Sequence, residues 1–153
     1  MPRAEPQSTP RRRVEAECAR RGRAAVIDGC TRLLSDTSEP DAVDAALILV
    51  LGGEPAAVVL RDDLPEVQRY WLRVWAARGL LWAWDADAPA AIDAIRRGLG
   101  DPAWRVREMC AKVVARHAVG ELWEAVTVLR DDQVPRVRSA ARRAMDSLAQ
   151  HRA

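Results

Sequence analysis

Apolar and small residues recur at helical spacing in three segments of this 153-residue chain, which begin at Val67, Val106 and Val137. In each segment, further residues suited to a core stand four, seven and eight positions after the valine. Positions at this spacing lie on one face of an α-helix. We therefore predict three amphipathic helices with the inward faces Val67, Trp71, Val74 and Trp75; Val106, Cys110, Val113 and Val114; and Val137, Ala141, Ala144 and Met145.

A short acidic stretch precedes each segment and follows a leucine: "RDDLPE" after Leu60, "GDPAWR" after Leu99 and "RDDQVPR" after Leu129. Paired aspartates can bind metals or perform acid–base chemistry, but that would require partner residues from distant segments. Aspartate is also favoured at helix N-termini, where its carboxylate accepts from unpaired backbone N–H groups. We expect this structural role, with the aspartates well apart at successive helix N-termini: Asp62 or Asp63, Asp101, and Asp131 or Asp132.

Two stretches share a leucine, a turn aspartate, a Val-Arg pair and an alanine-rich helix: "LGDPAWRVREMCAKVVARH" (99–117) and "LRDDQVPRVRSAARRAMDSLA" (129–149). In these stretches the chain resembles the HEAT-repeat family of armadillo-type proteins, whose units are stacked antiparallel helix pairs. The resemblance implies a ladder between turn aspartates and helix arginines of neighbouring units. Its members here would be Asp63, Asp101 and Asp132, with Arg107 and Arg138 as partners.

The implied fold is an all-α solenoid of about four stacked helix pairs, with about eight helices and no sheet. We expect one domain over residues 11–153, after a disordered tail at 1–10 that contains three prolines. Within the domain we predict a single capping helix over 11–35 and repeat units near 38–61, 62–99, 100–130 and 131–150. The unit at 38–61 would be two short helices hinged at Gly52-Gly53.

Charge is distributed unevenly along the chain, which holds 24 basic and 22 acidic residues. Both ends are basic and the middle is acidic, whereas a groove that follows a nucleic-acid backbone needs continuous positive charge. Nucleic acid is therefore a possible partner, but not the favoured one. No apolar run approaches the ~18 residues of a membrane span, so no membrane partner is expected.

The N-terminus lacks the apolar segment of a secretory signal, which favours a cytoplasmic location. The cysteines Cys18, Cys30 and Cys110 form no CxxC pair, and we expect them to be reduced and mostly buried.

Two groups of residues are candidates for binding. Arg73, Lys112 and Arg143 occupy one aligned position of the three predicted helices, so repeat stacking would present them as a row of exposed cations. The alternative is an ordinary solvated face. Trp82 and Trp84 stand near a predicted helix end, where exposure is plausible. Tryptophan beside arginine can anchor a protein partner or stack a nucleobase.

Catalytic chemistry finds little support in the sequence. His117 and His151 have no cysteine or carboxylate at metal-ligand spacing, and no phosphate-binding glycine loop or nucleophile motif is present. We expect no catalytic residue, metal or cofactor, and therefore a non-enzymatic scaffold or adaptor that binds a protein. The alternative implied by the resemblance is a nucleic-acid-binding module like the HEAT-like DNA-alkylation-repair enzymes. A third is an accessory protein like the HEAT-like chromophore lyases, which no particular residue supports.

Overall fold

The structure, a computed structural model, describes residues 8–35, 42–61 and 69–152. In these ranges the only regular secondary structure is helical, with nine α-helices, two short 3-10 helices and no strand, which confirms the predicted all-α class. The α-helices are α1 (Pro10–Arg21), α2 (Arg23–Ser35), α3 (Ala42–Gly52), α4 (Glu54–Arg61), α5 (Tyr70–Gly79), α6 (Pro89–Gly98), α7 (Trp104–His117), α8 (Trp123–Val128) and α9 (Pro135–Arg152). None of the described helices is long and apolar enough to cross a membrane.

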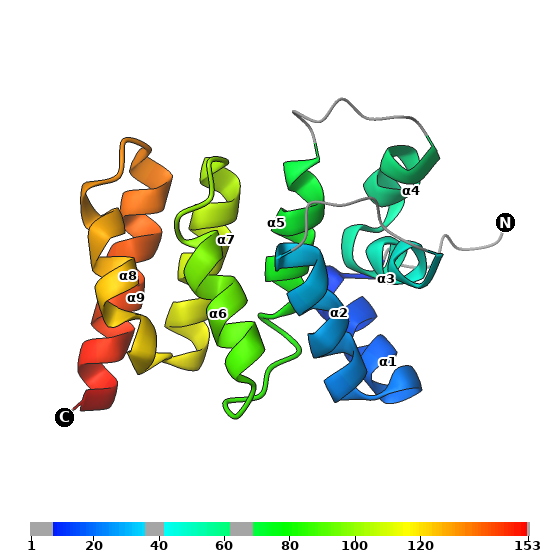
Figure 1. Ribbon diagram of the computed structural model, residues 1–153, viewed down its shortest axis with the longest axis horizontal. Coiled ribbons are helices and arrows are strands. Elements are labelled where there is room, and N and C mark those ends of the chain that lie inside the picture. Colours follow the sequence, from blue (N-terminus) through cyan, green and yellow to red (C-terminus); the bar gives the residue numbers. More distant parts are fainter. Residues whose placement is uncertain (1–7, 36–41, 62–68, 153) are drawn as a thin grey trace, which may run out of the picture.

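The helices stack in two rows. α5, α7 and α9 pack against one another in succession, while α6 packs on α7 and α8 on α9. In Figure 1, α6 and α8 lie in front of α7 and α9, and α1 and α9 lie at opposite ends of the elongated stack. The chain is therefore a helical repeat in which short turns join antiparallel neighbours.

The contacts group the helices differently from the predicted units. The predicted boundaries at 99/100 and 130/131 fall in the turns within the α6–α7 and α8–α9 hairpins, because these helices are the ones that pack together. Beside α5, the equivalent position is taken by α2, which contacts both α5 and α6. The short helices α3 and α4 come between α2 and α5 in the sequence, and α3 packs on α1, α4 and α5.

The predicted capping helix over 11–35 is wrong, since it is two helices that break at Gly22. Gly22 has φ 96°, a left-handed backbone region that glycine adopts without steric cost, and its N–H donates to the carbonyl of Cys18. The first helix also begins inside the predicted tail. Thr9 caps it by accepting from the N–H of Arg12, and Pro10 occupies its first turn. Residues 1–7 lie outside the described residues.

The predicted hinge at Gly52-Gly53 separates α3 from α4, and Gly53 has φ 67°. Two arginines satisfy carbonyls at the end of α3: Arg13 Nε donates to the carbonyl of Val50 at 2.8 Å, and Arg78 Nη2 to that of Leu51 at 2.7 Å. Burial, followed by the charge of Arg13, lowers the pKa of Arg78. These bonds attach α1 and α5 to the end of α3.

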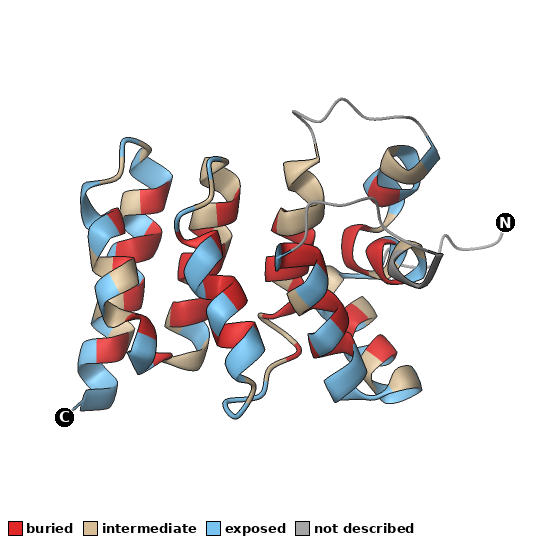
Figure 2. Ribbon diagram, in the orientation of Figure 1, coloured by how far each residue is buried: buried red, intermediate tan, exposed pale blue. Residues whose placement is uncertain are grey.

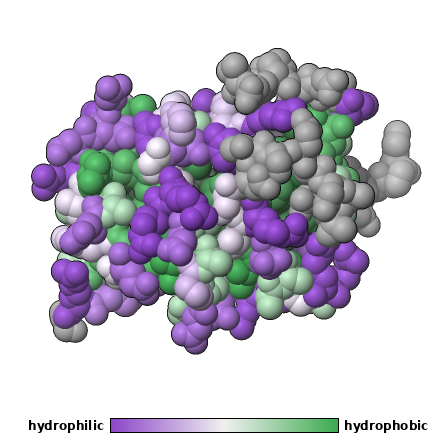
Figure 3. All heavy atoms as spheres, in the orientation of Figure 1, coloured by the Kyte–Doolittle hydropathy of each residue, from purple (hydrophilic) through white to green (hydrophobic). Residues whose placement is uncertain are grey.

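The core lies between the two rows of helices, where buried residues gather in Figure 2. The predicted inward faces of the last two helices are buried, apart from the half-buried Met145. In α5, Trp75 is buried and Trp71 half-buried, while Val67 lies outside the described residues. On the face shown in Figure 3, hydrophilic side chains cover most of the described surface.

All three cysteines are free, and Cys30 and Cys110 are buried. Burial raises the pKa of the Cys30 thiol to about 12 and also raises the pKa of the Cys110 thiol. These two side chains therefore pack as small apolar groups rather than as nucleophiles.

Candidate functional site

Two aspartates lie in the turns before α7 and α9, but neither is the N-cap residue. The carboxylate of Asp101 accepts from the N–H of Ala103 at 2.9 Å, and that of Asp132 accepts from the N–H of Val134 at 2.9 Å. Ala103 is the N-cap residue of α7 and provides no capping side chain. Each aspartate therefore stabilises the turn before its helix and lies two residues before the N-cap position, where it was predicted. Asp63 lies outside the described residues.

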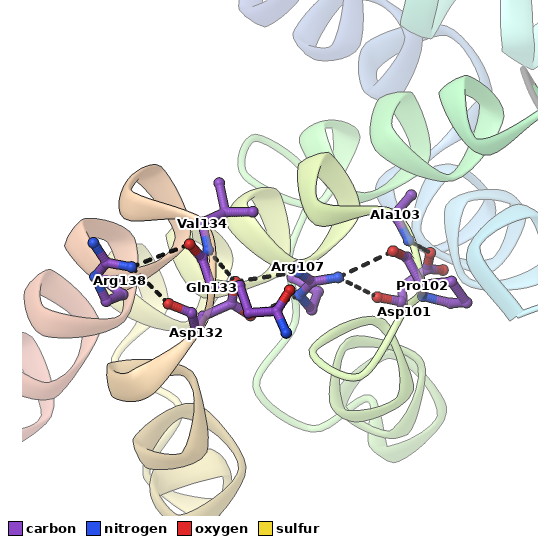
Figure 4. A network of polar contacts seen from close by, with 8 residues as sticks. All are labelled: Asp101, Pro102, Ala103, Arg107, Asp132, Gln133, Val134 and Arg138. Carbon is purple, nitrogen blue, oxygen red and sulfur yellow. Dashed lines mark hydrogen bonds and ion pairs between the residues drawn. The ribbon is translucent and has the colours of Figure 1, made fainter.

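Arg107 joins the two turns (Figure 4). Its Nε and Nη2 donate to the two carboxylate oxygens of Asp132 at 2.9 and 3.2 Å, and its Nη1 donates to the carbonyl of Asp101 at 2.8 Å. Arg138 repeats the second contact, with Nη1 2.8 Å from the carbonyl of Asp132. The contact between turn aspartate and helix arginine that the resemblance implies is therefore present between α7 and the turn before α9.

Arg73 belongs to the same ladder, which the sequence analysis missed. Its Nε and Nη2 donate to the carboxylate of Asp101 at 2.7 and 3.1 Å, and its side chain is only 19% exposed. Arg73, Arg107 and Arg138 are each the fourth residue of their helix, so they are the equivalent positions. We call Arg73, Asp101, Arg107, Asp132 and Arg138 the turn ladder.

The predicted row of exposed cations is therefore wrong. Arg73 forms an ion pair with Asp101 of the turn ladder. Lys112, the ninth residue of α7, has its Nζ 3.3 Å from a carboxylate oxygen of Glu108. Arg143 is exposed on α9. Arg73 is the fourth residue of its helix, whereas Lys112 and Arg143 are each the ninth of theirs. The three side chains therefore do not form one surface.

Trp82 and Trp84 line a pocket of about 490 Å³ at the other end of α5 and α7. They follow the end of α5, while Arg116 and His117 end α7 and Arg23 begins α2. The described residues that line it are Arg23, Leu81, Trp82, Trp84, Arg116 and His117. We call it the arginine–tryptophan pocket.

Cations lie over the ring of Trp82. The guanidinium carbons of Arg11 and Arg116 are 5.0 and 4.6 Å from its centroid, which is within the range of cation–π attraction. Arg116 is also oriented by its Nε, which donates to the carbonyl of Leu81 at 2.8 Å. The indole Nε1 of Trp82 is buried without a hydrogen-bond partner in the described part of the chain.

Trp84 stacks on His117 with ring centroids 4.7 Å apart and an interplanar angle of 5°. His117 Nε2 lies 2.8 Å from the carbonyl of Leu80, and since a carbonyl can only accept, Nε2 carries the proton. Burial lowers the pKa of His117, although the bond to Leu80 opposes the shift. The imidazole is therefore neutral at neutral pH.

The pocket has positive charge, and the described part of the chain places no balancing acid in its lining. Neither Arg23 nor Arg116 forms an ion pair with a carboxylate of the described residues. Arg11, at its edge, pairs with Glu15 at 2.8 Å. Such a pocket offers N–H donors and aromatic surface to an anionic group.

Of this pocket the sequence indicated only the two tryptophans, because Arg23, Arg116 and His117 come from segments far from them. Among the described residues, no three histidine, cysteine or acidic side chains gather where they could hold a metal ion. No protein-family model matches the chain, and neither curated proteins nor solved structures gave a match.

Proposed function

We propose that the chain is a non-enzymatic scaffold of HEAT-like type that binds a protein partner through the arginine–tryptophan pocket. The observation that carries the proposal is that Arg23 and Arg116 lie beside Trp82 and Trp84 and form no ion pair with an acid of the described residues. Tryptophan and arginine are the side chains that most often dominate the free energy of protein–protein binding.

The turn ladder supports this function by holding the helices that carry the pocket. Arg73 of α5 is bonded to the turn before α7, and Arg107 of α7 to the turn before α9. The end of α7 is tied to the residues after α5 by Arg116 and His117, which bond the carbonyls of Leu81 and Leu80. A pocket whose walls are held in this way loses little conformational entropy when a partner binds.

The nucleic-acid alternative has less support. It relies on surface arginine and tryptophan residues, and one of the arginines named for binding, Arg73, is neutralised by Asp101. Titration with duplex and single-stranded DNA at two salt concentrations tests it, because phosphate-driven binding must weaken steeply as salt rises.

Affinity capture from source cells tests the proposal when three chains are compared: wild type, Trp84→Leu and Trp123→Leu. Trp123 is the matched control because it is also a half-buried tryptophan stacked near an arginine, at the start of α8. We expect a specific protein to be recovered with wild type and Trp123→Leu and lost with Trp84→Leu. Recovery of the same proteins by all three folded chains would reject the pocket as the binding site.

A further inference from the structure

We infer that the arginine–tryptophan pocket binds the carboxylate side chains of an acidic peptide segment, an inference that rests on the proposed function and names the chemistry of the partner. Three features of the pocket point to a carboxylate: the donors left unused, the lack of an acid among the described lining residues, and the cations that already cover the Trp82 ring.

The unused donors have the geometry of a fork. The Nε of Arg116 donates to the carbonyl of Leu81, which leaves the two terminal nitrogens of the guanidinium available. Two parallel N–H groups of this kind match the two oxygens of a carboxylate. Arg23 makes no hydrogen bond or ion pair in the described part of the chain, so all of its donors are available. The pocket therefore holds two guanidinium groups that can each bind a carboxylate.

Among the described residues the lining contains no acid, and its histidine is neutral at neutral pH. An acidic peptide thus meets no like charge in the pocket. A glutamine-containing or basic peptide of the same length would leave both guanidinium groups without an anion. Charge therefore decides the choice of partner here.

The aromatic rings are already occupied. Arg11 and Arg116 lie within 5.0 Å of the Trp82 ring centroid, and His117 stacks on Trp84. A nucleobase that stacked on Trp82 would compete with these guanidinium groups for the ring, whereas a carboxylate binds to the guanidinium where it lies. The rings orient the cations, and the cations bind the ligand. This arrangement favours an acidic peptide over a nucleic acid.

Fluorescence titration of the full chain tests the inference with four probes. The first is a short peptide in which glutamate alternates with serine. The second and third have glutamine or phosphoserine in place of each glutamate. The fourth is a single-stranded DNA of equal charge. Each is titrated into wild type, Arg23→Gln and Arg143→Gln. Arg23→Gln removes a charge that makes no bond within the described fold, and Arg143→Gln removes a matched exposed charge from α9.

We expect the glutamate peptide to bind wild type and Arg143→Gln equally, and Arg23→Gln about tenfold more weakly, the size expected for one lost hydrogen bond to a charged group. The glutamine peptide should not bind measurably. Equal affinity for both peptides, equal weakening by Arg23→Gln and Arg143→Gln, or tighter binding of DNA would each overturn the inference. Binding of the phosphoserine peptide without binding of the glutamate peptide would overturn the choice of carboxylate.

The capture experiment separates this inference from the proposed function. A partner that is lost with Trp84→Leu but does not depend on Arg23 would leave the proposed function standing and reject the carboxylate as its ligand. A partner retained by Trp84→Leu would reject the proposed function itself.

Discussion

Arginine lies at both ends of α5 and α7, and its partners at the two ends are of different kinds. In the turn ladder, Arg73 and Arg107 each direct two nitrogens at one carboxylate, and their side chains are 19% and 17% exposed. At the pocket end, Arg116 lies over an indole ring and bonds a carbonyl, and Arg23 has no carboxylate partner among the described residues. Burying a guanidinium costs free energy unless an anion pairs with it, whereas an accessible guanidinium is solvated by water until a ligand binds.

This difference predicts opposite consequences of mutation. Loss of a ladder residue leaves a charge of opposite sign in a mostly buried place, so it should lower the free energy of unfolding. Loss of Arg23, the pocket arginine that makes no bond within the described fold, should leave stability unchanged and weaken binding.

The largest expected effect comes from Asp132→Ala, which removes the acceptor of two Arg107 hydrogen bonds and of the Val134 N–H. We expect the free energy of unfolding to fall by about 3 kcal/mol, as measured by urea denaturation. The neighbouring Asp131→Ala is the matched control, since Asp131 is 79% exposed and lies 3.7 Å from Arg130. It should cost less than about 0.5 kcal/mol. Equal losses from the two variants would contradict the ladder.

Arg73→Gln should have the next largest effect, about 2 kcal/mol, because the Asp101 carboxylate loses its charged donor. Lys112→Gln removes a cation that pairs with Glu108 on the same helix and should cost about 0.5 kcal/mol or less. Thermal unfolding of both variants measures the difference. If both variants had the same small effect, Arg73 would behave as the exposed cation first predicted.

A smaller effect is expected from pH. Burial alone would raise the pKa of Asp132, but the hydrogen bonds from Arg107 and Val134 and the charges of Arg107 and Arg138 outweigh it, so the pKa lies below its ordinary 3.8. A carboxyl with a lowered pKa stabilises the fold above its ordinary pKa and loses this contribution as the pH falls through the folded value.

The gap in unfolding free energy between wild type and Asp132→Asn should therefore be constant near neutral pH and narrow as the pH drops below 3.8. Urea unfolding along a pH series measures it. A gap that stayed constant into acid would show that the charge of Asp132 does not contribute.

The sequence predicted the C-terminal half of the fold better than the rest. In α7 and α9 the Val-Arg pair, the turn aspartate and the apolar face agree with one another, so their register was correct and Arg107 was placed in the ladder. Before α5 the anchor Val67 was chosen because it follows Leu60 and an acidic stretch, without a Val-Arg pair, and it aligned Arg73 with Lys112. The helix starts at Tyr70, which makes Arg73 the equivalent of Arg107. The equivalence of Arg73 and Arg107 is seen in their ion pairs with aspartates of the following turns. The hydrophobic pattern of one segment does not show which residues pair across helices.

The pocket was predicted only in part, for a related reason. Trp82 and Trp84 were recognised from their position near a helix end, but Arg23 stands far earlier in the chain and Arg116 far later. Their meeting depends on α2 packing beside α5 and α6, with α3 and α4 coming between in the sequence. That packing of a helix distant in sequence has no local signature.

The most direct test of the contrast between the two ends is the affinity of Arg23→Gln for the glutamate peptide, measured on protein whose urea midpoint is compared with that of wild type. We predict an unchanged midpoint and binding weakened about tenfold. A lowered midpoint with unchanged peptide affinity would contradict the account, because Arg23 would then stabilise the fold instead of binding a partner.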